Sequence, residues 1–412
     1  MSRPQPADGR PLARIPTPPG AAGVDAVLPA LAAALDGTGP AFAPVPTVSA
    51  AMSNDFVMTL LNAVQADPDS PPLEQPDVAV VMATSGSTGD PRGVLLTAGT
   101  LTSLSGDVNG GGRPQWIAAL PVTSMGGMNV LVRALDAGRA PVVLPSIGGA
   151  GPFTSADFAD AVSRAARTTD DIRVSLVPAQ VARLLGDDAG IGALRNCRSV
   201  LVGGGPTRPS LLSAAAELGI HLTRTYGATE TAGGCVFDGR PLPGVTVTTA
   251  SADPAEPGIL TVTGPCVASG YRADPQATAE RFTSAGFVTT DLGVVSADGE
   301  VTVIGRADEV VIIKGINVSP GAVERVVADL PDVVAAAVVV VEDPEQEPRM
   351  FVFVEVRDSA PAIDDAIAAA VRTALGAAAT PTVRQVPRLP HLPNGKVDRR
   401  TLQGWAASGR DT

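Results

Sequence analysis

The chain has 412 residues, with 30 lysines and arginines against 42 aspartates and glutamates, so its net charge at pH 7 is −12. This excess of acidic residues argues against sequence-independent binding of nucleic acid, which needs clustered cations. Hydrophobic residues make up 45% of the sequence, enough for large cores, and the length predicts two or three domains of roughly 150 residues each.

The segment before residue 77 is rich in proline and alanine, and its two amphipathic stretches, residues 24–35 and 57–64, predict helices. The N-terminal residues MSRPQPADGRPLARIP lack the apolar core of a secretory signal. The longest apolar run of the chain, residues 333–341, is too short for a membrane-spanning helix, which needs ~20 residues. We therefore expect a cytoplasmic protein without a membrane span, with its cysteines reduced.

From residue 78 onward, strand-like apolar runs alternate with helical stretches. Strands are predicted in residues 78–83, 115–120, 140–145, 173–178, 198–205 and 220–227. Helices are predicted in residues 157–167, 179–185 and 209–218. This alternation is typical of a doubly wound, parallel sheet that helices cover, and it predicts an α/β fold.

The predicted secondary structure changes twice in the last 170 residues. Helices are absent from our prediction for residues 239–306, where short β runs separated by glycine and proline indicate a small β-rich part. The final section returns to a mixed pattern, with helices and strands predicted in residues 319–329, 333–341, 349–356 and 364–375. This section therefore reads as a separate α+β unit.

The first motif with chemical content is TSGSTGDPRG, residues 84–93, directly after the predicted strand 78–83. Hydroxyl side chains and glycines let backbone N–H groups converge on phosphate oxygens. The Gly-Lys-Ser/Thr ending of a P-loop nucleotide hydrolase is absent, and a polar surface loop is the plain alternative. The candidate phosphate-binding residues are Thr84, Ser85, Gly86, Ser87, Thr88, Gly89 and Arg92.

The second motif is Tyr226-Gly227-Ala228-Thr229-Glu230, at the end of the predicted strand 220–227. An aromatic ring can pack on a purine, a hydroxyl can reach a phosphate, and the Glu230 carboxylate can hold Mg²⁺. Upstream, Gly203, Gly204 and Gly205 are expected to form a backbone turn beside a nucleotide, because their spacing does not fit a dinucleotide-binding fingerprint.

A third motif lies where the β-rich part ends. The Asp291 carboxylate can accept hydrogen bonds from a ribose diol, and the Arg306 guanidinium can neutralise a phosphate. Asp308 stands at the change from the β-rich part to the last section, a natural position for a hinge. These residues therefore predict a nucleotide site next to a mobile joint.

Only two of the 30 cations are lysines, and both lie in the last section. Lys314 precedes Gly315, and Lys396 stands in the turn 393–398, the fourth motif. A lysine that persists where arginine dominates elsewhere suggests a need for an ammonium group, since the two side chains are not interchangeable at a shaped site. Lys396 is the better catalytic candidate, and Lys314 reads as structural or close to a ligand.

In this order the four motifs resemble those of the adenylate-forming superfamily, which contains acyl-CoA synthetases, adenylation domains of peptide synthetases and luciferases. The resemblance runs from about residue 78 to residue 398. It implies a large N-terminal domain of doubly wound sheets with a small β-rich part, residues 1–307. It also implies a small, mobile α+β C-terminal domain, residues 308–412, that rotates about Asp308.

Within the superfamily, residues 175–185, 201–212 and 224–245 most resemble the o-succinylbenzoate–CoA ligases of menaquinone biosynthesis. The resemblance implies an enzyme that uses ATP, Mg²⁺ and coenzyme A to convert a carboxylic acid, first of all o-succinylbenzoate, into an acyl-AMP and then a CoA thioester. Residues 123–125 depart from the family, because Thr-Ser-Met replaces its usual pair of His and an aromatic residue. The sequence therefore predicts the reaction more firmly than it predicts the acyl substrate.

Three alternatives stay open at this point. The same chemistry can act on a different aryl or acyl acid of secondary metabolism, or it can deliver the acyl group to a carrier protein in place of coenzyme A. A non-catalytic nucleotide-binding protein is disfavoured, because Glu230, Asp291, Arg306 and Lys396 are all present. The sequence leaves a homodimer open.

The resemblance also implies a role for each candidate residue. Thr229 and the loop 84–93 would hold phosphates, Glu230 would hold the metal, and Lys396 would bridge the substrate carboxylate and the α-phosphate. After domain rotation, the loop at Gly315 would replace the loop at Lys396 and line the path of the incoming thiol. The implied catalytic set is Thr229, Glu230, Arg306 and Lys396.

Overall fold

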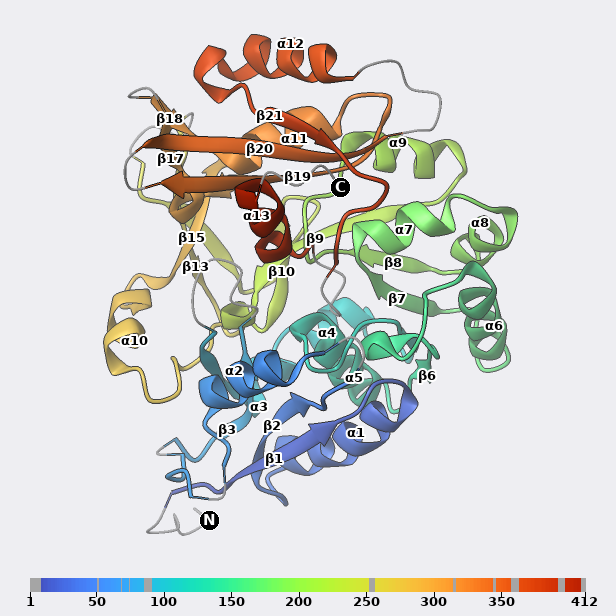
Figure 1. Ribbon diagram of the computed structural model, residues 1–412. Coiled ribbons are helices and arrows are strands. Elements are labelled where there is room, and N and C mark those ends of the chain that lie inside the picture. Colours follow the sequence, from blue (N-terminus) through green and yellow to red (C-terminus); the bar gives the residue numbers. More distant parts are fainter. Residues whose placement is uncertain are drawn as a thin grey trace.

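The computed structural model (Figure 1) describes residues 9–49, 52–67, 69–73, 75–84, 91–251, 256–313, 316–343, 346–356, 363–391 and 397–408. These residues form five sheets, of which the two largest belong to the N-terminal body of the molecule. None of the helices in these ranges is both long enough and apolar enough to cross a membrane.

The first sheet has the order β1-β2-β3-β4, with β4 antiparallel to the three parallel strands before it. Its strands are β1 (Leu12–Thr17), β2 (Ala41–Pro46), β3 (Val78–Ala83) and β4 (Gly93–Thr97). The two predicted N-terminal helices are confirmed as α1 (Ala21–Leu35) and α2 (Asn54–Val64). The two strands β3 and β4 bracket the loop that carries the first motif.

The second sheet has seven strands in the order β11-β10-β9-β8-β7-β5-β6, and its strands β5 to β9 pair in parallel. The strands are β5 (Gln115–Ala118), β6 (Val142–Val143), β7 (Ile172–Leu176), β8 (Ser199–Val202), β9 (Leu222–Ala228), β10 (Gly233–Phe237) and β11 (Arg240–Pro241). Consecutive residues of β5 face different cores, because Trp116 packs with α5 (Met125–Asp136) whereas Ile117 packs with the helices of the other face. The predicted doubly wound sheet is thus confirmed.

Short helices complete both faces of this body. On the face opposite α5 lie α6 (Ser155–Ala166), α7 (Pro178–Leu184), α8 (Asp188–Arg195) and α9 (Pro209–Glu217). Beside α5 lie α3 (Ala98–Thr102) and α4 (Ser105–Asn109).

The β-rich part is a third sheet with the order β12-β13-β15-β14, in which β16 also pairs with β15. Its strands are β12 (Thr246–Thr249), β13 (Gly258–Thr263), β14 (Phe282–Thr283), β15 (Gly286–Val295) and β16 (Val301–Arg306). The prediction that residues 239–306 lack helices is wrong, because α10 (Pro275–Arg281) lies there. Asp274 caps it by accepting a hydrogen bond from the Ala277 N–H at 2.9 Å, and Pro275 pre-sets its first turn.

The last section forms its own layers, visible at the top of Figure 1. Its elements are β17 (Val311–Ile313), β18 (Ile316–Val318), α11 (Pro320–Ala328), β19 (Val333–Asp343), β20 (Gln346–Val356), α12 (Asp364–Leu375), β21 (Thr382–Gln385) and α13 (Arg399–Ser408). The mixed pattern predicted for this section is confirmed, with β19, β20 and β21 forming one sheet between two small hydrophobic cores.

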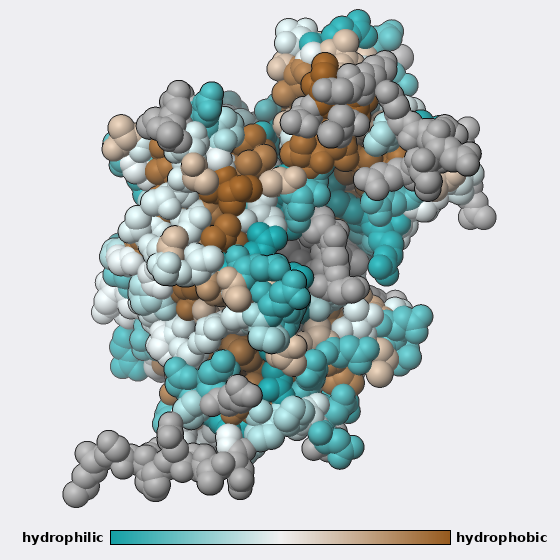
Figure 2. Space-filling view, turned by 90° about the vertical axis from the view of Figure 1, so that its left-hand side faces the viewer, coloured by the Kyte–Doolittle hydropathy of each residue, from teal (hydrophilic) through white to brown (hydrophobic). Residues whose placement is uncertain are grey.

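The hydrophobic cores divide close to the predicted joint. The cores of the body use residues up to 303, and those of the last section begin at residue 311. Two arginines bridge the parts: Arg208 donates to the Val333 carbonyl at 2.9 Å, and Arg325 donates to the Val303 carbonyl at 3.1 Å. On the face seen in Figure 2, hydrophobic residues form separate patches on a mostly hydrophilic surface.

Candidate functional site

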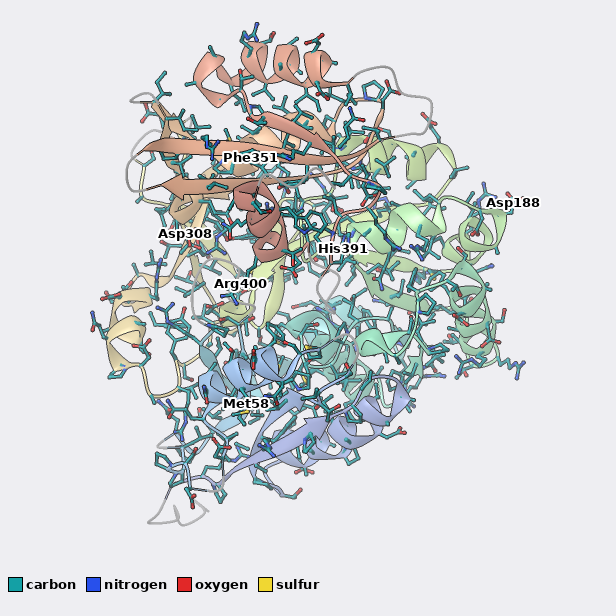
Figure 3. The ribbon with its side chains drawn as sticks, viewed as in Figure 1. Met58, Asp188, Asp308, Phe351, His391 and Arg400 are labelled. Carbon is teal, nitrogen blue, oxygen red and sulfur yellow. The ribbon has the colours of Figure 1, made fainter. Side chains whose placement is uncertain are left out.

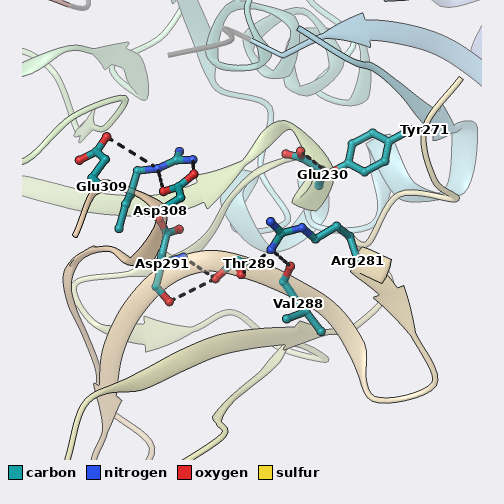
Figure 4. Close-up of polar contacts among 9 residues, drawn as sticks. Glu230, Tyr271, Arg281, Val288, Thr289, Asp291, Asp308 and Glu309 are labelled. Atoms are coloured by element: carbon teal, nitrogen blue, oxygen red, sulfur yellow. Dashed lines mark hydrogen bonds and ion pairs between the residues drawn. The ribbon is translucent and has the colours of Figure 1, made fainter. Parts of the chain in front are cut away.

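The candidate site lies where β8 and β9 end, at the carboxyl edge of the second sheet, against the hairpin of β15 and β16. In open α/β sheets, ligands bind outside the carboxyl ends of the strands. Figure 4 shows polar side chains of both regions converging there. The second and third motifs, which lie more than 60 residues apart in the chain, are thus brought together.

Glycines let the backbone pass closely at this edge. A Cβ atom on Gly227 would stand 1.8 Å from the Gly233 carbonyl oxygen, so β9 and β10 approach each other only because residue 227 has no side chain. A Cβ atom on Gly203 would stand 2.3 Å from the Thr225 hydroxyl, and Gly204 has a positive φ of 78°. The predicted glycine turn after β8 is therefore present, and it lies against β9.

The first polar pair joins the two motifs directly. The Tyr226 hydroxyl on β9 donates a hydrogen bond of 2.7 Å to Asp291 Oδ2 on β15. Burial, and then the Asp291 charge, raise the pKa of Tyr226, so the phenol keeps its proton and acts as a donor. The Asp291 N–H donates to the Thr289 hydroxyl at 3.0 Å, which further fixes the backbone that carries this carboxylate.

Arg306 faces Asp291 across the hairpin, because these two residues are register partners of β15 and β16. Its guanidinium forms a two-point ion pair with Asp308, with distances of 2.9 Å from Nε to Oδ1 and 2.6 Å from Nη2 to Oδ2. Glu309 Oε1 lies 3.8 Å from Nε. The hydrogen bond to Asp308, the largest cause, raises the pKa of Arg306. The predicted phosphate-binding cation and the predicted hinge residue are thus partners.

Glu230 lies in the short 3-10 turn Thr229–Thr231 that follows β9. Burial raises the pKa of Glu230, whereas a hydrogen bond from Tyr271 and the charge of Arg306 oppose this rise. The Tyr271 hydroxyl donates to Glu230 Oε1 at 2.9 Å, and the Ala268 N–H donates to the Glu230 carbonyl at 2.9 Å. The carboxylate is therefore held from a segment that no sequence motif had marked.

Tyr271 also contacts the end of the phosphate loop. The Arg92 guanidinium lies over the Tyr271 ring, 5.3 Å from its centroid, and Arg92 Nε is 3.3 Å from Asp274 Oδ2. Sequence reasoning missed both Tyr271 and Asp274. A usable signal was present in the string Tyr-Arg-Ala-Asp-Pro, because an aspartate before a proline marks the start of a helix, here α10.

Three of the predicted loops lie outside the described residues. They contain Ser85, Gly86, Ser87, Thr88 and Gly89 of the phosphate loop, then Lys314 and Gly315, and Lys396. The residues that flank each loop are nevertheless paired. Thr84 and Arg92 exchange hydrogen bonds of 2.8 and 2.9 Å, Ile313 pairs with Ile316, and His391 forms a bridge with Val397.

Figure 3 places Asp308 at the junction between the body and the last section. His391 is the last described residue before the loop that contains Lys396. Beyond the Lys396 loop, Arg399 at the start of α13 pairs with Glu324 of α11 at 2.8 Å. The Arg399 guanidinium also donates to the Val338 carbonyl at 2.5 Å. The base of the predicted lysine loop is thus attached to the core of the last section.

The departure at residues 123–125 has a structural explanation in part. The Ser124 hydroxyl donates to the Pro121 carbonyl at 2.7 Å and accepts from the Gly127 N–H, so it caps α5. Met125 is buried beneath Gly233. Of the three residues, Thr123 lines a cavity, which it shares with Thr17 and Gly148. A wall formed by these residues cannot supply the imidazole of the usual pair.

The chain is similar to known proteins over most of its length. The profile of AMP-binding enzymes matches residues 22–272, and that of the AMP-binding enzyme C-terminal domain matches residues 322–396. A probable 2-succinylbenzoate–CoA ligase of Mycobacterium tuberculosis (strain CDC 1551 / Oshkosh) is 36% identical over 383 residues, which cover 91% of this chain and 94% of the relative.

A sulfoacetate–CoA ligase of Cupriavidus necator is 32% identical over 367 residues, with 83% of this chain and 69% of the relative covered. Among solved structures, o-succinylbenzoate CoA synthetase of Bacillus subtilis, in complex with its acyl-adenylate intermediate, aligns with a TM-score of 0.76 at 21% identity. That alignment covers 96% of this chain and 89% of the solved chain. This structural likeness extends across both the body and the last section.

Proposed function

The chain belongs to the family of AMP-binding enzymes, and from this premise we propose that it is an ATP-dependent acyl-CoA ligase whose acid is 2-succinylbenzoate. The observation that carries the proposal is the convergence of Tyr226, Glu230, Asp291 and Arg306 on one edge of the sheet. The choice of acid rests on the relative from Mycobacterium tuberculosis, whose length this chain matches almost completely.

In the first half-reaction a carboxylate oxygen of the acid attacks the α-phosphorus of ATP. A new O–P bond forms, the bond between the α-phosphorus and the bridging oxygen breaks, and pyrophosphate leaves with that electron pair. Negative charge spreads over the phosphoryl oxygens in the transition state, so positioned cations and N–H groups supply most of the catalysis. We assign the bridging cation to Lys396 and phosphate binding to Thr229, Arg306 and residues 84–92.

The nucleoside part of ATP would lie over β9 and β15. The Asp291 carboxylate accepts the ribose hydroxyls, while Tyr226 holds this carboxylate in place and offers its ring to the purine. Gly203 and Gly227 let the backbone pack against β9 and β10, and beside them a side chain at Gly205 would meet no protein atom within 4 Å, so the nucleotide could approach the backbone there. A substitution at Asp291 would therefore weaken the binding of ATP more than the binding of the acid.

The residues at Glu230 fit Mg²⁺ that arrives with ATP better than a metal held by the protein alone. Mg²⁺ is commonly bound by one or two carboxylates together with substrate phosphates. No cluster of three or more His, Cys, Asp and Glu side chains occurs among the described residues. Glu230 is linked to the end of the phosphate loop, because Tyr271 contacts both Glu230 and Arg92. When bound, the ion would neutralise phosphate charge, and Tyr271 would keep Glu230 oriented for it.

In the second half-reaction the thiol of coenzyme A attacks the acyl carbon. A C–S bond forms, the C–O bond to AMP breaks, the thiol loses its proton, and AMP leaves. The proposal divides the chain into residues 1–307 and 308–412, with a rotation about Asp308 that exchanges the Lys396 loop for the loop of Lys314 and Gly315. The ion pair between Arg306 and Asp308 would have to adapt during this rotation.

A second candidate is the same ligation with a different acid, or with a carrier-protein thiol as acceptor. The observation in its favour is the Thr123-Ser124-Met125 segment, in which the serine caps a helix and the methionine is buried. Of the three residues, Thr123 lines a cavity, and none of them supplies an imidazole, so acids other than 2-succinylbenzoate belong in any test.

The test is pyrophosphate release from MgATP with 2-succinylbenzoate, with other aryl acids and with short aliphatic acids, each with and without coenzyme A. We expect release with 2-succinylbenzoate and a CoA thioester detectable by mass spectrometry. If pyrophosphate is released only with another acid, the proposed substrate is wrong but the proposed reaction stands. An absence of release with every acid would refute the enzyme.

The role of Lys396 is tested separately by Lys396→Ala. We expect acyl-AMP formation to be lost, while thioester formation from supplied acyl-AMP largely persists, because the lysine acts only where carboxylate and α-phosphate meet. Equal loss of both half-reactions would refute this assignment. Arg400→Ala, on α13, is the matched control for a lost cation near the same loop.

A further inference from the structure

A small cavity behind the candidate site carries chemistry that the proposed reaction does not use. It lies between α4, α5 and the segment that follows the turn Thr229–Thr231. Its walls include Ser105, Asn129, Arg133, Ala232 and Cys266. The cavity has room for about one water-sized species.

Arg133 brings a positive charge into this cavity. Its relative exposure is 6%, and its guanidinium has no hydrogen bond or ion pair with any residue that the structure describes. One face of the group lies over the Trp116 ring, 5.4 Å from its centroid. A buried charge without a counter-charge is costly, and an aromatic face offsets only part of that cost.

Arg133 cannot escape this cost by losing its proton. Burial lowers the pKa of Arg133 to about 10, which still leaves it protonated at neutral pH. Burial is the cause of that shift, and none of the carboxylates that the structure describes forms an ion pair with this guanidinium. The cation therefore needs a partner from outside the chain.

Two further polar groups face the same space. Ser105 is 3% exposed, and its hydroxyl makes no hydrogen bond to the described part of the chain. Asn129 lies one helical turn before Arg133 on α5, so both side chains project from one face of the helix. One Nδ2 hydrogen of Asn129 is used by the Ala232 carbonyl at 2.7 Å, which leaves its second hydrogen as a donor.

We propose that this cavity binds one small monovalent anion, with chloride as the physiological ligand, between Arg133, Ser105 and Asn129. All three groups are donors, which is the arrangement an anion requires. The small space between these three groups favours a single small ion over a phosphate. A neutral water would fill the space but would leave the charge of Arg133 uncompensated.

The anion would lie outside the candidate site but would be connected to it through Asn129 and Ala232. Asn129 holds the Ala232 carbonyl, and Ala232, with a positive φ of 49°, ends the turn that contains Glu230. A filled cavity would therefore stabilise the body of the molecule and this strained turn together. If the cavity is empty or holds only water, the stability of the protein should not depend on which anion is present.

The direct test uses crystals of the full chain soaked in sodium bromide, because bromide replaces chloride and has an anomalous signal. We expect an anomalous peak within hydrogen-bonding distance of the Arg133 guanidinium, and no peak in Arg133→Met. If the wild-type crystals show no anomalous peak there and only ordinary water density, the proposal is overturned.

The solution test compares thermal unfolding in sodium chloride and in sodium gluconate at equal ionic strength. Above saturation we expect the midpoint to rise by roughly 2 °C for each tenfold increase in chloride, and not in gluconate. Arg133→Met should remove this difference. Arg164→Met, which removes an exposed arginine paired with Asp160 at 2.9 Å, should keep it.

A second variant covers the case in which Arg133→Met does not fold. Ser105→Ala keeps the charge but removes one donor, and we expect about fivefold more chloride to be needed for the same rise of the midpoint. An unchanged response in Ser105→Ala would contradict the placement of the anion at this hydroxyl. A bromide peak without any chloride effect in solution would mean binding at crystal concentration only and would refute a physiological anion site.

Discussion

Two tyrosine–carboxylate pairs organise the candidate site, and they are built in different ways. The chain contains only two tyrosines, and each donates its hydroxyl to a carboxylate of the site, Tyr226 to Asp291 and Tyr271 to Glu230. Burial is the largest cause that raises the pKa of both phenols, so both remain donors. The same chemical contact therefore holds both the carboxylate that we propose for the ribose and the carboxylate that we propose for the metal.

The surroundings of the two carboxylates differ. Asp291 lies on a regular strand, where Arg306 is its register partner and the Thr289 hydroxyl accepts its N–H. Glu230 lies in a turn of three residues, and its side chain is held by a tyrosine from a distant segment. The pairing of β15 with β16 keeps Asp291 in place even without Tyr226, whereas the orientation of the Glu230 side chain depends on Tyr271. The pairs should therefore respond differently to loss of the hydroxyl.

The largest effect is expected when the ribose-side carboxylate itself is changed. Asp291→Asn keeps the shape but removes the charge that, in our proposal, accepts the ribose hydroxyls. Hydrogen bonds to a charged acceptor contribute about 1.5–3 kcal/mol each, so kcat/KM for ATP should fall about 100-fold. The measurement is pyrophosphate release against ATP concentration. An unchanged KM for ATP would place the ribose elsewhere, and an unchanged unfolding midpoint would show that the fold is intact.

The next effect concerns the metal side. Tyr271→Phe removes a hydrogen bond that lowers the pKa of Glu230 while burial continues to raise it, so the pKa of Glu230 rises further. Glu230 must be ionised to hold Mg²⁺, and the acidic limb of the profile of kcat/KM against pH should therefore move to higher pH. Activity should fall about tenfold at pH 6 and much less at pH 8. A uniform loss at all pH values would contradict the assignment.

The matched change on the ribose side should be milder. Tyr226→Phe removes the donor to Asp291, but the strand pairing and the Thr289 contact remain. We expect KM for ATP to rise about fivefold, in keeping with a net hydrogen bond of about 1 kcal/mol, and the pH profile to stay in place. A shift of the acidic limb in this variant would remove the distinction between the two pairs.

The same contrast shows what the sequence could predict. Asp291 and Tyr226 stand in strings whose residue types already suggest nucleotide chemistry, and the period of the apolar runs predicted the strands that carry them. Tyr271 was missed because its role depends on a contact across 41 residues. The ion pair between Arg306 and Asp308 was missed because each residue had been given a separate role.

The helix α10 and the anion cavity were also beyond the sequence analysis, for different reasons. The capping signal of α10 was readable at Asp274 and Pro275, but the surrounding glycines and β runs outweighed it. The charge of Arg133 gave no signal, because an arginine on an amphipathic helix usually faces solvent. Its burial follows from packing between α4, α5 and the strand of Trp116, which sequence periodicity does not encode.

The smallest effect tests whether the metal-side pair is coupled to the phosphate loop. Arg92→Lys keeps the charge but loses the planar stack on Tyr271. An exposed cation–π contact contributes about 0.5–1 kcal/mol, so KM for ATP should rise about threefold. Because Arg92 touches the ring of Tyr271 and not that of Tyr226, the effects of Arg92→Lys and Tyr271→Leu, which removes the ring, should be non-additive in a double-mutant cycle, whereas those of Arg92→Lys and Tyr226→Leu should add. Additivity in both cycles would mean that the loop and Glu230 act independently.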